Sequence, residues 1–186
     1  MPPKVKITRE AIVDTAVEIV RKSGAHAINA RTVAAALNCS TQPIFSNFAT
    51  MDALRLAAMQ KADAICRVYI QREVEHGEFP PYKASGMAYI RFAKEERELF
   101  KLLYMCDRSG GEIPEESDLT EEMFAMVKGN TGLSGDSTKL FHLEMWAYVH
   151  GIAAMFATKY LDLEWDLVSK MLTDAYQGLK KQYGME

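Results

Sequence analysis

Residues 28–54 read INARTVAAALNCSTQPIFSNFATMDAL. This stretch predicts two short helices joined by a tight turn. Asn29 can cap the first helix, because its side chain can accept hydrogen bonds from the unpaired N–H groups at a helix start. Asn38 tolerates the left-handed backbone conformation that a tight turn requires, and Ser40 or Thr41 can cap the second helix. The spacing is that of a helix-turn-helix, in which the second helix enters the major groove of DNA.

The side chains of this segment separate into an inward and an outward set. The small residues at positions 34–36 allow the two helices to approach closely. The residues expected to form a small core with Ile12 and Ile19 are Val33, Leu37, Ile44 and Phe48. The polar side chains that are left to point outward are Arg31, Thr32, Thr41, Gln42, Ser46 and Asn47. Such groups suit contacts to phosphates and base edges.

The rest of the chain predicts further helices and no strand, because apolar residues recur at helical spacing and alternating β-branched runs are absent. We expect helices from Thr8 to Gly24, from Thr50 to about Gly77, and over residues 81–95, 96–106, 119–128, 137–160 and 163–183. The Gly- and acid-rich segment 107–118 is expected to be a loop. The fold class is therefore all-α, with a three-helix helix-turn-helix domain over residues 1–52 and a larger helical effector-binding and dimerisation domain over residues 53–186.

Charge is divided unevenly along the 186 residues, whose net charge is −3. Residues 1–60 carry seven basic and four acidic side chains, whereas the remaining 126 residues carry 15 basic and 21 acidic ones. A basic segment on an acidic body favours attachment to a polyanion. No stretch reaches the roughly 20 apolar residues of a membrane span, and the N-terminus lacks the apolar segment of a signal peptide. We therefore expect a cytoplasmic protein.

The sequence predicts neither a metal site nor a cofactor. Cys39, Cys66 and Cys106 lie far apart with no CxxC pair, which favours reduced thiols over disulfides or a zinc site; a redox-sensing role for them is an alternative. His142 and His150 lie eight residues apart on one predicted helix, about 12 Å along its axis, which is too far to share one ion.

The segment STQPIFSNFATMDAL, which follows a capped Ala-rich helix, resembles the recognition helix and the start of the connecting helix in the TetR family of transcriptional regulators. Chain length, helical pattern and N-terminal placement match as well. Trp146, His150 and Gly151 are similar to the Trp-His-Gly signature of one class of TetR C-terminal domain. The resemblance implies contact with DNA by Asn29, Arg31, Thr32, Thr41, Gln42, Pro43, Phe45, Ser46 and Asn47.

Within this set, Arg31 lies where some members read a guanine, and Gln42 can read an adenine. Three positions depart from the family pattern. Phe45 stands where tyrosine is common, Asn47 where histidine is common, and Met51 where a lysine usually meets phosphate. They predict a weaker hold on phosphate, unless Lys4, Lys6 and Arg9 compensate. For Phe45, packing in the core is an equal alternative to facing DNA.

The predicted C-terminal domain is rich in aromatic residues and methionines, a composition that suits an adaptable apolar pocket for a hydrophobic or aromatic small molecule. Any single one of these residues can instead be core, and His150 can instead make a buried hydrogen bond. The candidate pocket residues are Tyr89, Phe92, Phe100, Tyr104, Met123, Trp146 and His150.

The last two predicted helices carry apolar stripes, which consist of Leu140, Leu143, Ala147 and Ala154, and of Leu167, Met171, Leu172, Tyr176 and Leu179. In the TetR family two such helices from each subunit form a four-helix interface, so the resemblance implies a homodimer. Burial within the monomer is the alternative. A dimer can place two recognition helices on half-sites about one turn of DNA apart.

Together these features predict a ligand-responsive transcriptional regulator and not an enzyme. We expect a repressor that binds a palindromic operator as a homodimer and is released by a small-molecule effector. A small helical enzyme is a poorer interpretation, because the chain has no Glu-x-x-His pair, no Gly-rich phosphate loop and no nucleophile signature. A helical interaction module that does not bind DNA leaves the basic N-terminal segment unexplained.

Overall fold

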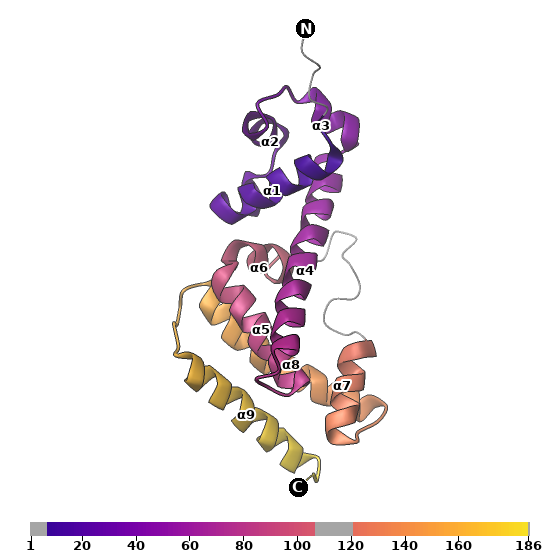
Figure 1. The fold of residues 1–186 in the computed structure, drawn as a ribbon, viewed down its shortest axis with the longest axis vertical. Helices are drawn as coiled ribbons and strands as arrows, with labels where there is room; N and C mark the ends of the chain where they lie inside the picture. Colours follow the sequence, from indigo (N-terminus) through magenta and orange to yellow (C-terminus); the bar gives the residue numbers. More distant parts are fainter. Residues whose placement is uncertain (1–6, 107–120, 186) are drawn as a thin grey trace. The chain divides into compact units, whose positions relative to one another are not determined.

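The computed structural model describes residues 7–106 and 121–185, and in these ranges it contains helices and no strand, which confirms the predicted all-α class. The predicted loop over residues 107–118 lies outside the described residues. No helix in the described ranges is both long and apolar enough to cross a bilayer. The helices, drawn in Figure 1, are α1 (Arg9–Ser23), the short 3₁₀ helix η1 (Ala25–Ala27), α2 (Ala30–Ala36), α3 (Gln42–Asn47), α4 (Met51–His76), α5 (Pro81–Glu95), α6 (Arg97–Tyr104), α7 (Glu121–Thr131), α8 (Asp136–Ala157) and α9 (Trp165–Gln182).

The ends of the helices follow local sequence signals. Thr8 caps α1 by accepting a 3.1 Å hydrogen bond from the N–H of Ala11, and Gly24 ends the helix with a φ of 81° that L side chains rarely adopt. Helix α8 ends at Ala157, three residues before the predicted end, and Lys159 then takes a left-handed φ of 58°. The capping residues that the sequence predicted at Thr8 and Gly24 are therefore confirmed.

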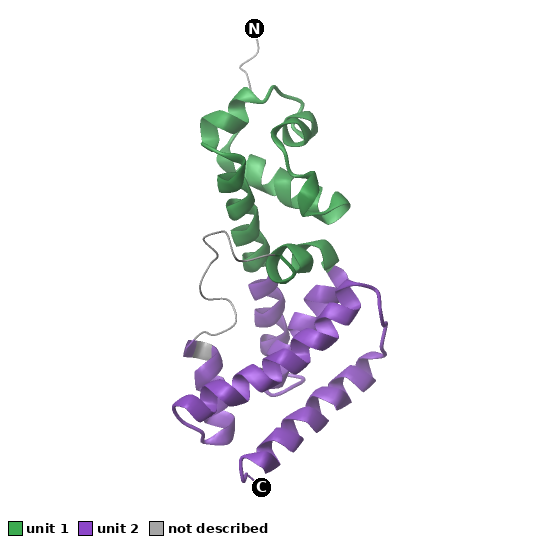
Figure 2. Ribbon diagram, turned by 180° about the vertical axis from the view of Figure 1, so that it is seen from behind, with its two compact units in different colours: residues 1–65, 96–113 green, residues 66–95, 114–186 purple. Residues whose placement is uncertain are grey.

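The described chain divides into two compact units, which Figure 2 shows in separate colours. Of the described residues, the first unit comprises 7–65 and 96–106, and the second comprises 66–95 and 121–185. Helix α6 thus belongs with the N-terminal helices, although the predicted boundary at residue 52 separates it from them. That boundary concerned which residues bind DNA and which bind an effector, and it stays a prediction.

The first unit has its core between α1, α2, α3 and the beginning of α4. The buried apolar side chains of these helices include Ile12, Val13, Val17, Val20, Val33, Ile44, Phe48 and Leu54. Ile19 and Leu37, which the sequence also predicted in this core, are only half-buried. Buried residues on α1 recur at intervals of three and four, and Ile19 lies at the edge of the face that they define.

Helix α6 is joined to α1 by a two-pronged ion pair. Arg21 donates from Nε and Nη2 to the two carboxylate oxygens of Glu96, at 2.9 and 2.7 Å. Hydrogen bonding to Glu96 raises the pKa of Arg21 above its ordinary value. On the inner side of α6 the buried residues are Leu99, Phe100, Leu102 and Leu103. An apolar face and a bidentate pair therefore hold α6 against α1.

The second unit is built around α5, which packs against α7, α8 and α9. Its residues from Ala84 to Ala93 are buried, apart from Gly86 and Arg91, which are partly exposed. Helices α5, α8 and α9 converge at Gly86, where an added Cβ would lie 3.2 Å from Leu172 and 3.5 Å from Val149. The absence of a side chain at Gly86 therefore allows these three helices to approach closely.

Candidate functional site

The helix-turn-helix begins with a complete capping box at Asn29. Its Oδ1 accepts hydrogen bonds from the N–H groups of Arg31 and Thr32, at 3.0 and 3.1 Å, and the hydroxyl of Thr32 accepts from the N–H of Asn29 at 3.2 Å. These bonds satisfy N–H groups that have no partner within α2. After α2, Asn38 adopts a φ of 51°, the left-handed conformation predicted for the turn.

The start of α3 differs in one respect from the prediction. Thr41 occupies the N-cap position, but its side chain makes no capping hydrogen bond. Its backbone is already helical, with φ −73° and ψ −14°, whereas a residue that caps through its side chain is ordinarily extended. Pro43 lies in the first turn of α3, where a missing N–H does little harm, as predicted.

The predicted DNA-contacting residues differ in what their side chains already do. Among the exposed members of the set, Arg31, Gln42 and Phe45 have side chains that form no ion pair or hydrogen bond with a described residue. Phe45 is 53% exposed, so the alternative that it belongs to the core is wrong. These side chains are available to a partner on the outer face of the motif.

The other members of the set also hold the motif together. Ser46 donates to the carbonyl of Gln42 at 2.9 Å, and Asn47 donates to the carbonyl of Pro43 at 2.7 Å. Asn29 and Thr32 form the capping box, and Thr41 and Pro43 are half-buried at the start of α3. For these six residues a structural role therefore accompanies the predicted contact with DNA.

Of the three basic residues expected to compensate for Met51, the structure describes Arg9. Its guanidinium lies 4.7 Å from the centre of the Phe48 ring, beside the C-terminal end of α3. Lys4 and Lys6 lie outside the described residues. Thr50, next to Met51, caps α4 by accepting a 3.1 Å hydrogen bond from the N–H of Ala53. A positive charge is thus fixed beside the motif even though Met51 carries none.

The second unit encloses a cavity of about 390 Å³, within the size range of small-molecule pockets. Three of the predicted pocket residues, Tyr89, Met123 and Trp146, line it. His150 lies behind them, since its Nδ1 is 2.9 Å from the Tyr89 hydroxyl and its ring stacks on Trp146 with centroids 5.0 Å apart. The alternative role for His150, a hydrogen bond within the fold, is therefore present, although this bond is only partly buried.

The other three predicted pocket residues do not line this cavity. Phe92 is fully buried and meets the edge of the Tyr69 ring at a centroid distance of 5.5 Å. Phe100 and Tyr104 lie on α6 in the first unit, where their rings contact each other. The aromatic composition that suggested them does not distinguish a cavity wall from a core.

Several lining residues were missed, and the pair Tyr82 and His142 is the most informative. The Tyr82 hydroxyl lies 3.0 Å from Nδ1 of His142, so α5 and α8 are bridged twice by a Tyr–His pair, with Trp146 between the two histidines on α8. Burial raises the pKa of Tyr82 well above its ordinary value, so its phenol keeps its proton at neutral pH. Tyr82 and Tyr89 lie seven residues apart on α5, and this helical spacing in the sequence could have predicted the pair of Tyr82 and His142.

The remaining wall is apolar or neutral apart from Lys83, which carries a formal positive charge. Helices α8 and α9 contribute Met145, Val149, Leu172 and Tyr176. The indole N–H of Trp146 is buried and donates to none of the described residues. No three His, Cys, Asp or Glu side chains in the described part of the chain are grouped so as to hold a metal ion.

Residues 82–175, just over half of the chain, match the family described as "Tetracyclin repressor-like, C-terminal domain". The chain belongs to the TetR family. This confirms the resemblance that residues 28–54 and the motif near Trp146 suggested. Membership of the family is consistent with the N-terminal helix-turn-helix followed by a helical domain, which is the arrangement of TetR transcriptional regulators.

Solved structures share this TetR fold at low sequence identity. A TetR-like transcriptional regulator from Rhodococcus sp. RHA1 is 16% identical, with a TM-score of 0.67 over 96% of this chain and 98% of the other. A TetR-family member from Streptomyces coelicolor A3 is 20% identical, with a TM-score of 0.62 over 90% and 96%. The multidrug binding protein EbrR, complexed with imidazole, is 19% identical, with a TM-score of 0.61 over 90% and 88%. No curated protein matches the sequence.

Proposed function

We propose that this chain is a ligand-responsive repressor, which binds a palindromic operator as a homodimer and releases it when a small molecule occupies the cavity of the second unit. The observation that carries the proposal is the presence in one TetR-family chain of two separate features. One is an exposed helix-turn-helix face on which the side chains of Arg31 and Gln42 make no hydrogen bond or ion pair with a described residue. The other is a largely apolar cavity lined by aromatic residues.

Operator recognition rests on the outer face of α2 and α3. The fork of N–H donors on Arg31 fits the two acceptors of a guanine, and the amide of Gln42 can both donate to and accept from an adenine. The side chains of Ser46 and Asn47, at the far end of α3, lie where they can reach phosphate or base edges. Arg9 adds a cation that attracts the phosphate backbone.

Dimerisation is supported by apolar side chains that α8 and α9 leave exposed. Leu140 is 52% exposed, Leu143 41% and Leu167 46%. A Cβ built at Gly151 would have no atom of the described residues within 4 Å beyond its neighbours and the backbone of its own helix. A second copy would remove these surfaces from water, at roughly 25 cal/mol for each Å² of apolar area. Only part of the predicted apolar stripe on α9 is available to a second copy. Leu172 is buried within the monomer, and Tyr176 and Leu179 pack against a core cluster of the same unit.

Release requires that the effector bind better to a conformation with poor affinity for the operator, since a ligand shifts an equilibrium only by its differential affinity. Helix α4 carries residues of both units in one continuous helix, which makes it one of the covalent connections between the unit with the cavity and the unit with the motif. The aromatic and methionine side chains of the cavity favour a hydrophobic or aromatic effector.

The proposal is tested by an electrophoretic mobility shift with DNA from upstream of the chain's own gene, at two salt concentrations. We expect a complex of two chains per site that resists nonspecific competitor and weakens as salt rises. If that DNA does not bind, selection from genomic fragments follows. Failure of both would contradict the proposal and favour a helical module that does not bind DNA.

A further inference from the structure

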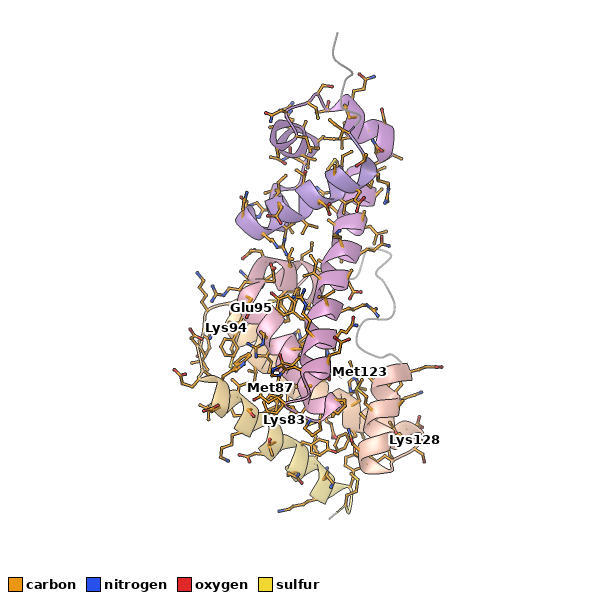
Figure 3. The ribbon with its side chains drawn as sticks, in the orientation of Figure 1. Lys83, Met87, Lys94, Glu95, Met123 and Lys128 are labelled. Atoms are coloured by element: carbon orange, nitrogen blue, oxygen red, sulfur yellow. The ribbon has the colours of Figure 1, made fainter. Side chains whose placement is uncertain are left out.

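Lys83 is a lysine on the wall of a largely apolar cavity. It lies on α5, and Figure 3 labels it together with Met123 of α7, which lines the same cavity. Its ammonium donates to the hydroxyls of Ser169 and Thr173 on α9, at 2.8 and 2.9 Å. It also lies 4.5 Å from the centre of the Phe79 ring. The charge is thus held in one place by three neighbours.

None of these neighbours carries a negative charge. In the same unit, Lys94 and Lys170 each lie 2.6 Å from an aspartate oxygen, whereas Lys83 forms no ion pair with a described residue. The described residues that line the cavity include no aspartate or glutamate. The hydroxyls satisfy two of the three N–H donors of the ammonium. Because a hydroxyl carries no net charge, these hydrogen bonds leave the positive charge of Lys83 without a negative partner among the described residues.

We infer that the effector of this cavity is a small organic anion, with a flat apolar body held by the aromatic and methionine side chains and one acidic group bound by Lys83. This inference rests on the proposed function, since it names the ligand class of the same site. An uncompensated charge beside an apolar wall attracts an anion more strongly than it would in water and repels a cation. Lys83 therefore selects the charge of the ligand.

The remaining wall fits the rest of such a molecule. Tyr82, Tyr89 and Trp146 present aromatic surface, and Met145 adapts to irregular shapes. The indole N–H of Trp146 is buried without an acceptor among the described residues, and an unmatched buried donor is unfavourable. The wall thus offers two donors, an N–H of the Lys83 ammonium beyond its two hydroxyl partners and the indole N–H of Trp146, which complement the acceptor oxygens of a carboxylate, sulfonate or phosphate.

Two fluorescent dyes with the same apolar body test the inference. 1-Anilinonaphthalene-8-sulfonate carries an anionic group, and N-phenyl-1-naphthylamine lacks it. We expect the native chain to bind the sulfonate at least about tenfold more tightly than the neutral dye, in the range of a hydrogen bond to a charged group. The variant Lys83→Met, which keeps an unbranched apolar stem but removes the ammonium, should lose this preference and bind the neutral dye unchanged.

The control is Lys94→Met, a lysine on the same helix that does not line the cavity. It should retain the native preference, which excludes a general attraction of the sulfonate to surface cations. Equal affinity of the native chain for both dyes, or an unchanged preference in Lys83→Met, would overturn the inference while leaving the cavity as an effector site. Absence of binding by either dye would contradict the cavity as a ligand site, and with it both the inference and the effector part of the proposed function.

Discussion

At the residue level, the helix-turn-helix separates side chains that build the motif from side chains that face outward. The polar side-chain groups of Asn29 and Thr32 form the hydrogen bonds of the capping box. Arg31, between them in sequence, points away from these bonds and is exposed. Neighbouring residues on a helix face different directions. One short segment can therefore form the capping hydrogen bonds and also expose the side chain of Arg31.

This separation predicts the effect of replacing Arg31 or Gln42 by alanine. Each variant should bind the operator about 5- to 150-fold more weakly, corresponding to about 1–3 kcal/mol for one lost base contact. Their thermal stability should be unchanged, because neither side chain makes a hydrogen bond within the described residues. Fluorescence anisotropy with labelled operator measures the affinity, and Arg72→Ala, an exposed arginine of the second unit, is the control. Normal operator binding by both variants would show that the motif reads DNA with other residues.

The ion pair between Arg21 and Glu96 predicts an effect on stability alone. Arg21→Met should reduce the free energy of unfolding by about 1 kcal/mol, since it leaves the half-buried carboxylate of Glu96 without its partner and the pair is partly screened by solvent. Glu18→Gln removes the more exposed partner of the same arginine and should change stability by less than about 0.5 kcal/mol. Urea unfolding compares the two. Equal losses in the free energy of unfolding would mean that the ion pair between Arg21 and Glu96 stabilises the chain no more than the exposed pair with Glu18.

At the level of elements, the second unit depends on how closely α5 approaches α8 and α9. Most of α5 is buried, and Gly86 sets the distance to Leu172 and Val149. The same glycine lines the cavity. Close packing of the three helices and the shape of the cavity are therefore determined together.

Gly86→Val should destabilise the chain by about 1–3 kcal/mol, because the added methyl groups would overlap neighbouring side chains. Gly129→Ala on α7 is the matched control, since no atom lies within 4 Å of a Cβ built there. It should raise stability by about 0.5–1 kcal/mol through the better helix propensity of alanine. Thermal unfolding followed by circular dichroism measures both. A stability of Gly86→Val equal to that of the native chain would show that the helices adjust without loss.

At the level of the whole molecule, operator binding and dimerisation are predicted to depend on each other. The double variant Leu143→Glu, Leu167→Glu places charges on the exposed apolar surface of α8 and α9 and should sediment as a monomer. Its affinity for the full operator should fall at least about 100-fold, because one helix-turn-helix then holds only one half-site. Val68→Glu, at another exposed apolar residue, should remain dimeric. A monomeric double variant with native operator affinity would contradict the homodimer.

Much of the structure follows from local sequence. Helix class, the caps at Thr8 and Asn29 and the turn at Asn38 depend on residues within about four positions of one another, and all were predicted. Exposure of Arg31 and burial of Val33 follow in the same way from helical periodicity. These features require no knowledge of distant segments.

The cavity and its chemistry were decided only by the tertiary structure. Tyr82 and His142 lie 60 residues apart, and Lys83 meets Ser169 and Thr173 across an even longer stretch of chain. Phe92 and Tyr89 belong to the same helix, yet one is core and the other lines the cavity. Periodicity specifies which side of a helix is apolar, but the neighbours on that side depend on which helices pack against it. The sequence alone therefore determined the family resemblance and the two short helices of the motif, whereas the packing of α5, α7, α8 and α9 formed the cavity and placed Lys83 on its wall.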